Sequence, residues 1–254
     1  MGAFTLNIVA IIQARCNSSR LTGKVLADID GKPLVERVVN RIKQVELIDK
    51  VVVATSISAS DNPLEEWCKS EKVDFFRGSE SNVLERFYEC AKAFDANIVV
   101  RITADDPFKD PVVISQAVNL LINNNYDYVS NTLKPTYPEG IDVEVFRFEA
   151  LEVAFKNATL SSECEHVTPY IWKDSIKFSL FNFEYTKNLS YLRWTIDYPE
   201  DLEFTRAVYI KMRDKAGVFL MKDILSLLKK YPALTKIQRN IIRNEGYLTS
   251  IKED

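Results

Sequence analysis

The sequence predicts an α/β protein in which helices cover both faces of a mostly parallel central sheet. Short apolar runs alternate with segments of helical periodicity over the first half of the chain. The runs IVAII and VVVAT are continuously apolar, as are strands of a parallel sheet that is buried on both faces. Polar, aperiodic segments follow the first and the fourth expected strands. Open α/β sheets bind their ligands at such strand ends.

The first half reads as strands joined by helices. Pro33 favours a helix start, and Leu34, Val38 and Ile42 recur behind it at helical spacing. A turn is expected at residues 77–79, Arg-Gly-Ser. The expected elements are strands at residues 8–12, 51–55, 73–76 and 96–102, and helices at residues 33–45, 61–72 and 83–94.

The second half begins with the same alternation and then changes at LKPTYPEG, residues 133–140, which predicts a loop or a small excursion from the sheet. Asp142 and Glu144 should share one face of the strand that follows, because side chains alternate along a strand. Residues 250–254 form a polar tail with little reason to be ordered. Further strands are expected at residues 126–131, 142–146, 176–183 and 192–196, and helices at 111–122, 148–155, 163–172, 199–211, 222–230 and 237–242.

Composition limits the classes of function. The chain has 254 residues and a formal net charge of -3, so no global field recruits nucleic acid or an anionic membrane. Cysteines at positions 16, 68, 90 and 164 have neither paired nor zinc-like spacing, which predicts reduced thiols. The amino terminus shows no basic leader, and its apolar run is too short to span a bilayer. We therefore expect a soluble, cytoplasmic protein with one domain over residues 1–254.

A cationic loop follows the first strand. Arg15, Arg20 and Lys24 fall within ten residues of each other. The short polar side chains between them, among them Asn17, Ser18 and Thr22, leave backbone N–H groups accessible. These groups suit a polyphosphate, although a solvated basic loop would have the same pattern.

Carboxylates follow two of the later strands. Asp105 and Asp106 end one of them, before Pro107, and Asp197 ends another. Magnesium keeps several waters and needs only one or two protein carboxylates beside phosphate oxygens, so two strand-end aspartates would suffice. Capping of the following turn or helix is the alternative role for these side chains.

Several familiar signatures are missing. The loop lacks both the Gly-x4-Gly-Lys-Ser/Thr pattern and the G-x-G-x-x-G pattern, which disfavours kinase, GTPase and dehydrogenase functions. His166 is the only histidine, and no G-x-S-x-G elbow accompanies it, which disfavours triad hydrolysis. Cys16 lies beside arginines that could lower its pKa, but a small tolerated side chain is the simpler interpretation.

Several motifs stand in order along nearly the whole chain. They are AIIQARCNSSRLTGKVLADIDGKPL, RGSESNVLERF, VVRITADDPFKDP, YVSNTLKPTYPEGIDVEVF, EHVTPYI and RWTIDYPEDLE. Together they resemble the cytidylyltransferases that activate sugar acids, and their pattern looks like the branch typified by spore coat polysaccharide biosynthesis protein F.

The resemblance implies a three-layer, Rossmann-like nucleotidyltransferase fold of the GT-A type, with residues 133–190 as an excursion for the acceptor side and for dimerisation. It implies attack of an acceptor oxygen on the α-phosphate of CTP, release of pyrophosphate, a requirement for Mg²⁺, and a homodimer. The implied catalytic residues are Arg15, Arg20, Lys24, Asp105 and Asp197, of which the two aspartates, and possibly Asp106, would hold the metal.

The resemblance also implies which residues bind the two substrates. CTP would be bound by Gln13, Ala14, Arg15, Ser18, Lys24, Thr55, Arg77, Gly78, Ser79 and Val83. A small anionic acceptor would be bound by Asn131, Tyr137, Glu139, Asp142, Glu144 and His166, for which a structural loop and a dimer-forming strand are the alternative roles.

The chain departs from the branch at three positions. It has Ala104-Asp105-Asp106-Pro107 for G-D-C-P, Thr22 for proline, and Cys164 for arginine. These departures leave the acceptor open. We expect a nonulosonic or 3-deoxy-octulosonic acid that is activated for a surface polysaccharide. The alternatives are a phosphate or phosphonate acceptor, which would give a CDP-type product, and a non-catalytic nucleotide-binding assembly subunit.

Overall fold

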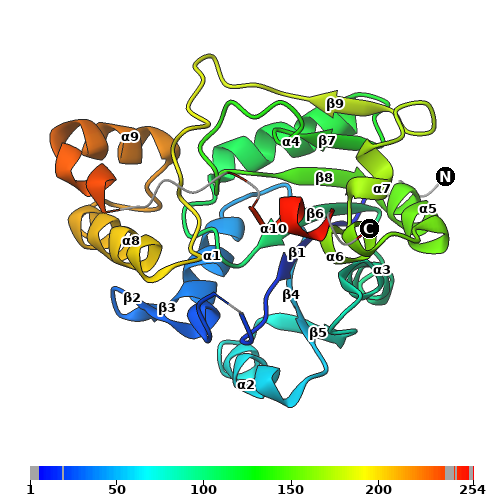
Figure 1. The fold of residues 1–254 in the computed structure, drawn as a ribbon, viewed down its shortest axis with the longest axis horizontal. Coiled ribbons are helices and arrows are strands. Elements are labelled where there is room, and N and C mark those ends of the chain that lie inside the picture. Colours follow the sequence, from blue (N-terminus) through cyan, green and yellow to red (C-terminus); the bar gives the residue numbers. More distant parts are fainter. Residues whose placement is uncertain (1–5, 19, 238–242, 244, 252–253) are drawn as a thin grey trace.

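A mostly parallel sheet runs through the centre of the computed structural model, as the sequence predicts (Figure 1). The structure describes residues 6–18, 20–237, 243, 245–251 and 254. In this part of the chain the sheet has seven strands in the order β5-β4-β1-β6-β8-β7-β9, and β8 alone is antiparallel to its neighbours. The strands are β1 (Ile8–Gln13), β4 (Lys50–Ser56), β5 (Asp74–Gly78), β6 (Ile98–Thr103), β7 (Tyr128–Ser130), β8 (Glu144–Arg147) and β9 (Leu180–Asn182).

The register places three strand ends side by side. Gln13, the last residue of β1, pairs with Ala54 of β4 and with Thr103 of β6. The loops that follow β1 and β6 therefore leave the sheet at the same edge. This is the edge at which parallel α/β sheets bind ligands.

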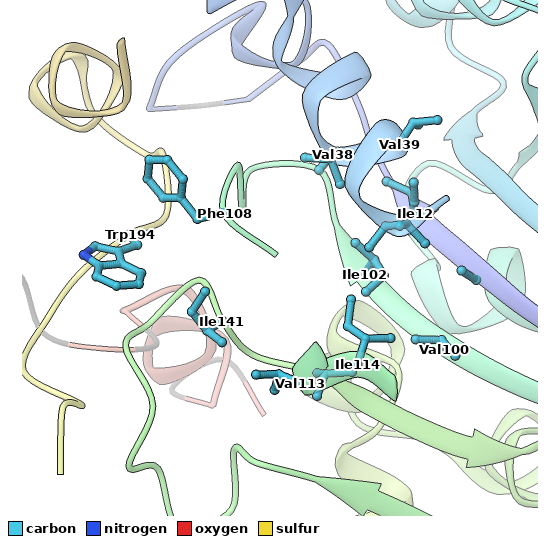
Figure 2. Close-up of a cluster of buried hydrophobic side chains, with 14 of the residues drawn as sticks. Ile12, Val38, Val39, Val100, Ile102, Phe108, Val113, Ile114, Ile141 and Trp194 are labelled. Carbon is cyan, nitrogen blue, oxygen red and sulfur yellow. The ribbon is translucent and has the colours of Figure 1, made fainter. Parts of the chain in front are cut away.

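Helices pack on both faces of the sheet, which gives three layers. Side chains of β1 alternate between two cores: Ala10 and Ile12 face one, and Val9 and Ile11 face the other. The first core (Figure 2) is covered by α1 (Leu34–Ile42), α2 (Asn62–Ser70), α4 (Pro111–Asn123), α8 (Pro199–Met212) and α9 (Met221–Lys230). The second is covered by α3 (Val83–Ala93), α5 (Phe148–Asn157) and α7 (Pro169–Trp172), and α6 (Ser161–His166) packs against α3 and α7.

The structure contains several short elements that the sequence did not predict. The loop after β1 contains a 3-10 helix at Lys24–Leu26, and a small antiparallel pair, β2 (Asp28–Ile29) and β3 (Lys32–Pro33), precedes α1. Two more 3-10 turns lie at Ala59–Asp61 and Pro232–Lys236. A last helix, α10 (Glu245–Ser250), lies beside α6.

Four local predictions are wrong. Arg77 and Gly78 belong to β5 and not to a turn. The expected helix at 163–172 breaks at Val167, whose φ is 72°, and restarts at Pro169, where a proline is tolerated. The strand expected at 176–183 is confined to β9. Residues 192–196 join no strand of the sheet and pair only through one bridge, between Glu139 and Arg193.

Ser250 and Asp254 of the predicted polar tail make defined contacts, and residues 252 and 253 lie outside the described residues. Ser250 is buried, and Asp254 accepts hydrogen bonds from the N–H and the hydroxyl of Ser162, at 2.8 and 2.5 Å. The helix expected at residues 237–242 lies, apart from its first residue, outside the described residues. The excursion expected at 133–190 contributes β8 and β9 to the main sheet. No helix in the described ranges combines the length and apolarity needed to cross a membrane.

Candidate active site

Two adjoining pockets lie at the shared edge of β1 and β6. The small pocket, of about 150 Å³, is lined by the loop after β1, and the large pocket, of about 570 Å³, is lined mainly by residues 101–144, 166–172 and 193–197. The residues that line both pockets are Arg20, Thr103, Asp105 and Asp197. Any group transferred between ligands in the two pockets would pass this junction.

Lys24 joins the carboxylates at the junction. Its ammonium donates to Asp105 Oδ2 at 2.8 Å, to Asp197 Oδ1 at 3.0 Å and to the carbonyl of Ile196 at 2.6 Å. Burial disfavours the charged ammonium, but the two carboxylates outweigh that effect and raise the pKa of Lys24. The positive φ of Gly23, 73°, precedes the 3-10 turn that orients this lysine inward.

Asp197 is the most highly connected carboxylate of the junction. Arg20 Nη2 lies 2.6 Å from its Oδ1, and Arg193 Nη2 lies 2.7 Å from its Oδ2. Burial opposes its ionisation, but Lys24, Arg20 and Arg193 lower the pKa of Asp197 to about 2. The carboxylate is therefore charged throughout the physiological pH range.

Asp105 and Asp197 fit the requirements of a hard divalent cation. Both bond the same ammonium, so their oxygens converge on one place, and both lie beside the small pocket. Among the described residues no three Asp, Glu, His or Cys side chains form a complete metal site. Two carboxylates are what Mg²⁺ uses when phosphate oxygens and water supply the remaining ligands.

Asp106 is held differently from Asp105. Its carboxylate pairs with Lys109 Nζ at 2.7 Å and accepts from the hydroxyl of Thr103 at 2.6 Å, and the residue is buried. Burial opposes its ionisation, but Lys109 outweighs burial and lowers the pKa of Asp106. This side chain lies on the wall of the large pocket, but its oxygens are committed to structural contacts.

The small pocket collects half of the predicted CTP-binding residues. Gln13 and Ala14 end β1, and Arg15, Ser18 and Lys24 follow in the loop; all five line this pocket. Arg20 lies at the junction with a side chain that is one third exposed. The predicted cationic loop is thus one wall of a pocket with a cation-rich lining.

The other predicted CTP-binding residues line neither pocket. Arg77 donates to the carbonyls of Ser56 and Ser58, at 2.8 and 2.6 Å, and its other contacts are with α2. Gly78 packs against Arg86, and an added Cβ would lie 3.0 Å from its Cγ. The buried residues Thr55 and Val83 lie at the end of β4 and at the start of α3, and Ser79 caps the turn before α3.

Four of the predicted acceptor residues line the large pocket: Glu139, Asp142, Glu144 and His166. Asp142 and Glu144 thus both line it, but Val143 between them lines it too, and Asp142 precedes β8, so the alternation expected for a strand at 142–146 does not explain their shared placement. The other two brace the pocket from behind. Asn131 is fully buried and bonds the backbone of Ile141 and Val143, and Tyr137 packs edge-on against Phe183.

Arginines that the sequence did not single out are paired with these carboxylates. Arg193 Nη1 lies 2.8 Å from Glu139 Oε2, and Arg101 forms an ion pair with Glu144. Arg193 lies within the segment RWTIDYPEDLE. Arg101 interrupts an apolar strand, and this position could have indicated a buried, paired arginine. Glu245 and Tyr247 also line the large pocket, and no sequence pattern pointed to them.

A close backbone approach fixes the acceptor-side loop. Gly140 has a φ of 98°, and a Cβ at this position would lie 2.6 Å from the carbonyl oxygen of Trp194. The Glu139 backbone bonds the same stretch: its N–H donates to the Leu192 carbonyl at 2.9 Å, and Trp194 N–H donates to the Glu139 carbonyl at 2.8 Å. Only glycine allows this approach, which places Glu139 beside Arg193.

Two potential nucleophilic or basic groups have contrasting surroundings. Burial, together with Arg101, lowers the pKa of His166 to about 4, so its imidazole is neutral in the large pocket. Burial and the neighbouring Asp61 raise the pKa of Cys16 to about 11, so its thiol stays protonated.

Arg86 is a buried arginine near Arg15 of the small-pocket loop. Burial and Arg15 lower the pKa of Arg86 to about 10, and its Nε and Nη2 have no hydrogen-bond partner among the described residues.

A cation-lined pocket and a second pocket that meet at two converging carboxylates, on a three-layer α/β fold, define a nucleotidyltransferase. The sequence model of the cytidylyltransferase family matches residues 9–231, and the chain belongs to this family, whose members transfer CMP from CTP.

Individual relatives match most of the chain. The chain is 36% identical over 246 residues to the uncharacterized protein MJ1063 of Methanocaldococcus jannaschii, covering 95% of this chain and 98% of that one. It is 30% identical over 238 residues to the spore coat polysaccharide biosynthesis protein SpsF of Bacillus subtilis, covering 89% and 95%. A solved cytidylyltransferase from Leptospira borgpetersenii superposes with a TM-score of 0.87 at 28% identity, covering 94% of this chain and all of that one.

A more distant group of relatives matches part of the chain. The 3-deoxy-manno-octulosonate cytidylyltransferase of Trichlorobacter lovleyi is 33% identical over 119 residues, which are 47% of this chain and 46% of that enzyme. The match thus leaves more than half of each protein unaligned.

Proposed function

We propose that this cytidylyltransferase transfers CMP from CTP to a sugar acid, with release of pyrophosphate, in the synthesis of a surface polysaccharide. The observation that carries the proposal is the junction: Asp105 and Asp197 line both the small and the large pocket. A triphosphate in the small pocket and an acceptor in the large one would therefore meet at these carboxylates. The names of the relatives, a spore coat polysaccharide protein and an octulosonate cytidylyltransferase, support the choice of pathway and acceptor.

In this reaction an acceptor hydroxyl oxygen forms a bond to the α-phosphorus while the bond to the bridging oxygen of the β-phosphate breaks. The electron pair leaves with pyrophosphate, and the hydroxyl proton passes to solvent. Arg15, Arg20 and Lys24 would hold the triphosphate and neutralise the charge that develops on the leaving group. Such a transfer depends on alignment and charge neutralisation more than on a protein nucleophile.

We infer that Mg²⁺ is held by Asp105 and Asp197 and supplies further neutralisation of the phosphate charge when bound. Lys24 bonds both carboxylates and lines the small pocket, so its ammonium is placed to follow the phosphates. Arg193 anchors Asp197 from the acceptor side. These residues orient the reacting groups from both sides of the junction.

The charges of the large pocket favour an acceptor with one negative charge over a doubly charged phosphate. The cations Arg101 and Arg193 are already paired with Glu144 and Glu139. Two further carboxylates of the lining, Asp142 and Glu245, are paired with Arg243 and Arg20, so no lining arginine among the described residues is left for a second negative charge. A phosphate or phosphonate acceptor would face more repulsion there than a single carboxylate would.

Pyrophosphate release tests the proposal. Purified protein with CTP and Mg²⁺ is assayed against sugar acids, sugar phosphates and neutral sugars, with 3-deoxy-manno-octulosonic acid as the first probe. We expect release only with a sugar acid. Release with a phosphate acceptor would replace the proposal by CDP-product synthesis. CTP binding without release for any acceptor would favour a non-catalytic subunit.

Two further properties belong to the proposal. We propose a cytoplasmic enzyme, since CTP is the donor and the four cysteines are free thiols.

We also propose a homodimer. Sedimentation velocity tests this directly: we expect a mass near twice 29.1 kDa, and a monomer over the whole concentration range would refute the dimer.

A further inference from the structure

The carboxyl-terminal segment closes one side of the large pocket. We define the C-terminal strap as the described residues of 243–254, namely Arg243, residues 245–251 and Asp254. Its helix α10 lies over the strand-end edge of the sheet and beside α6 (Figure 1). Glu245 and Tyr247 of this helix line the large pocket, and neither lines the small one.

The strap is fastened mainly to the acceptor side of the molecule. Arg243 forms an ion pair with Asp142 and donates to the carbonyl of Tyr137 at 3.0 Å. Ser250 donates to Glu165 at 2.6 Å, and its hydroxyl lies 3.0 Å from Nε2 of His166. The strap is thus tied to both ends of the segment that carries the acceptor-side residues.

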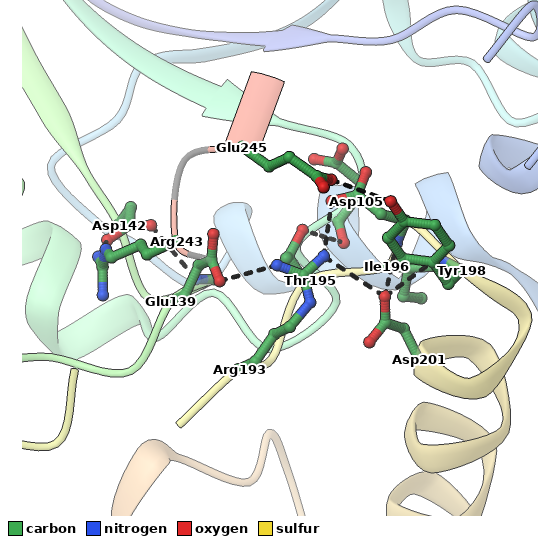
Figure 3. Close-up of polar contacts among 12 residues, drawn as sticks. Asp105, Glu139, Asp142, Arg193, Thr195, Ile196, Tyr198, Asp201, Arg243 and Glu245 are labelled. Carbon is green, nitrogen blue, oxygen red and sulfur yellow. Dashed lines mark hydrogen bonds and ion pairs between the residues drawn. The ribbon is translucent and has the colours of Figure 1, made fainter. Parts of the chain in front are cut away.

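Glu245 also connects the strap to the junction. Its Oε2 accepts from Arg20 Nη1 at 3.1 Å and from the hydroxyl of Tyr198 at 2.9 Å (Figure 3). Arg20 bonds Asp197 with its other terminal nitrogen, at 2.6 Å. The strap therefore spans the large pocket from the transfer point to its far end.

Three rings form an aromatic corner at that far end. The ring of Tyr247 meets His166 at 5.2 Å between centroids and Trp172 at 5.7 Å, both edge-on. All three residues line the large pocket and none lines the small one. Aromatic faces and edges pack well against the C–H face of a sugar ring or an acyl methyl group, while their polar atoms remain available to hydroxyls.

The strap lies outside residues 9–231, the part of the chain that the cytidylyltransferase family model matches. We propose that Tyr247 of the strap is an acceptor-recognition residue, which packs on an apolar ring face or acyl substituent of the sugar, away from the reacting hydroxyl. The inference rests on the proposed function, because it assigns the occupant of the large pocket.

Steady-state kinetics of three variants test the inference with whichever acid the acceptor assay identifies. Tyr247→Ala should raise KM for the acceptor about tenfold and leave KM for CTP within about twofold. Tyr247→Phe should behave like the parent, because it retains the ring. Tyr191→Ala, at a tyrosine that is 76% exposed and lines neither pocket, is the matched control and should change nothing.

The outcomes distinguish a failure of the role of Tyr247 from a failure of the proposed function. An acceptor KM for Tyr247→Ala within about twofold of the parent value overturns the role of Tyr247. If that variant unfolds, Tyr247→Leu keeps the bulk without the aromatic face and should show the same rise in acceptor KM. If the parent protein binds CTP but none of the tested acceptors elicits release of pyrophosphate, the proposed function fails, and the inference fails with it.

Discussion

The ammonium of Lys24 lies 3.0 Å from Asp197 Oδ1, although 173 residues separate the two in the sequence. The same ammonium bonds Asp105. The two carboxylates, of which Asp197 is buried and Asp105 half-buried, would repel each other at this distance, and the shared cation compensates for that repulsion. One side chain of the small-pocket loop therefore holds together the junction at which the two pockets meet.

Replacing Lys24 by methionine should nearly abolish transfer. The variant keeps the length of the side chain but removes the charge that we propose neutralises the phosphates, and loss of one such donor typically costs about 100- to 1000-fold in kcat. Pyrophosphate release measures the loss. Lys32→Met, at an exposed lysine paired with Glu36, is the control. Activity above about a tenth of the parent level would contradict this role.

Asp197→Asn should abolish Mg²⁺-dependent turnover without unfolding the protein. The fold should survive because each cation around Asp197 keeps another carboxylate: Lys24 keeps Asp105, Arg20 keeps Glu245 and Arg193 keeps Glu139. Turnover against Mg²⁺ concentration and urea denaturation are the two measurements. Unchanged turnover would remove Asp197 from the proposed metal site.

Asp106→Asn provides the contrast to Asp197→Asn. Its carboxylate is the buried partner of Lys109, and leaving such a cation without its partner costs about 3–5 kcal/mol of stability. We expect a large drop in the urea midpoint while the residual folded protein retains its Mg²⁺ dependence. A fully stable variant that no longer responds to Mg²⁺ would instead place Asp106 in the metal site.

The stability of the protein should fall as pH drops from about 6.5 to about 4. The pKa of His166 is lowered from 6.5 to about 4, so the folded protein keeps the imidazole neutral while the unfolded chain takes up a proton. Over two pH units this difference amounts to about 2 kcal/mol, and it fades as the pH rises above 6.5. Urea denaturation at several pH values measures it, and His166→Asn should flatten this part of the profile. An identical profile for the variant would show that other groups cause the loss.

Three of the four cysteines should resist alkylation in the folded protein. Cys16, Cys68 and Cys90 are buried, and burial raises the pKa of their thiols to about 11, 12 and 12. Iodoacetamide at neutral pH should modify only Cys164, and that slowly, since burial raises its pKa as well. All four should react in urea, and mass spectrometry can count the modified cysteines. Rapid labelling of Cys16 in the folded state would contradict this prediction and indicate a reactive thiolate at Cys16.

Gly140→Ala should destabilise the protein by about 2 kcal/mol or more, because the new Cβ would clash with the carbonyl oxygen of Trp194 in addition to straining a positive φ. Gly217→Ala separates the two effects, since Gly217 has a φ of 70° but no heavy atom near its Cβ position. The control should lose only about 1 kcal/mol. Equal losses for both variants, measured by urea denaturation, would show that the contact with Trp194 carries no cost.

Periodicity predicted most of the fold because the strands are buried on both faces and the helices on one. It could not orient Arg77, since an arginine at a strand end looks the same whether it faces a ligand or, as here, the backbone after β4 and helix α2. Leu192 to Ile196 has the composition of a strand, yet its bonds go to the backbone of Glu139 and Asp105. Pro169 marks the break within the helix expected at 163–172.

Long-range contacts account for the rest. The cationic loop and the aspartates were predicted from local patterns, and the structure brings Lys24, Asp105 and Asp197 together. The tail was expected to be disordered because its composition is polar. Its position depends on partners such as Ser162, which bonds Asp254 across 92 residues of sequence. Single-sequence periodicity carries no information about such pairs.

The C-terminal strap also bears on how enzymes of this kind diversify. The groups proposed to handle the triphosphate lie within the family-matched residues 9–231, whereas Glu245 and Tyr247 lie beyond them. If Tyr247 recognises the acceptor as proposed, a substitution there would change the choice of sugar without altering a residue that holds the triphosphate, whereas a substitution of Glu245 would also disturb Arg20 at the junction. The variable part of such an enzyme would then be a single aromatic position outside the family-matched residues.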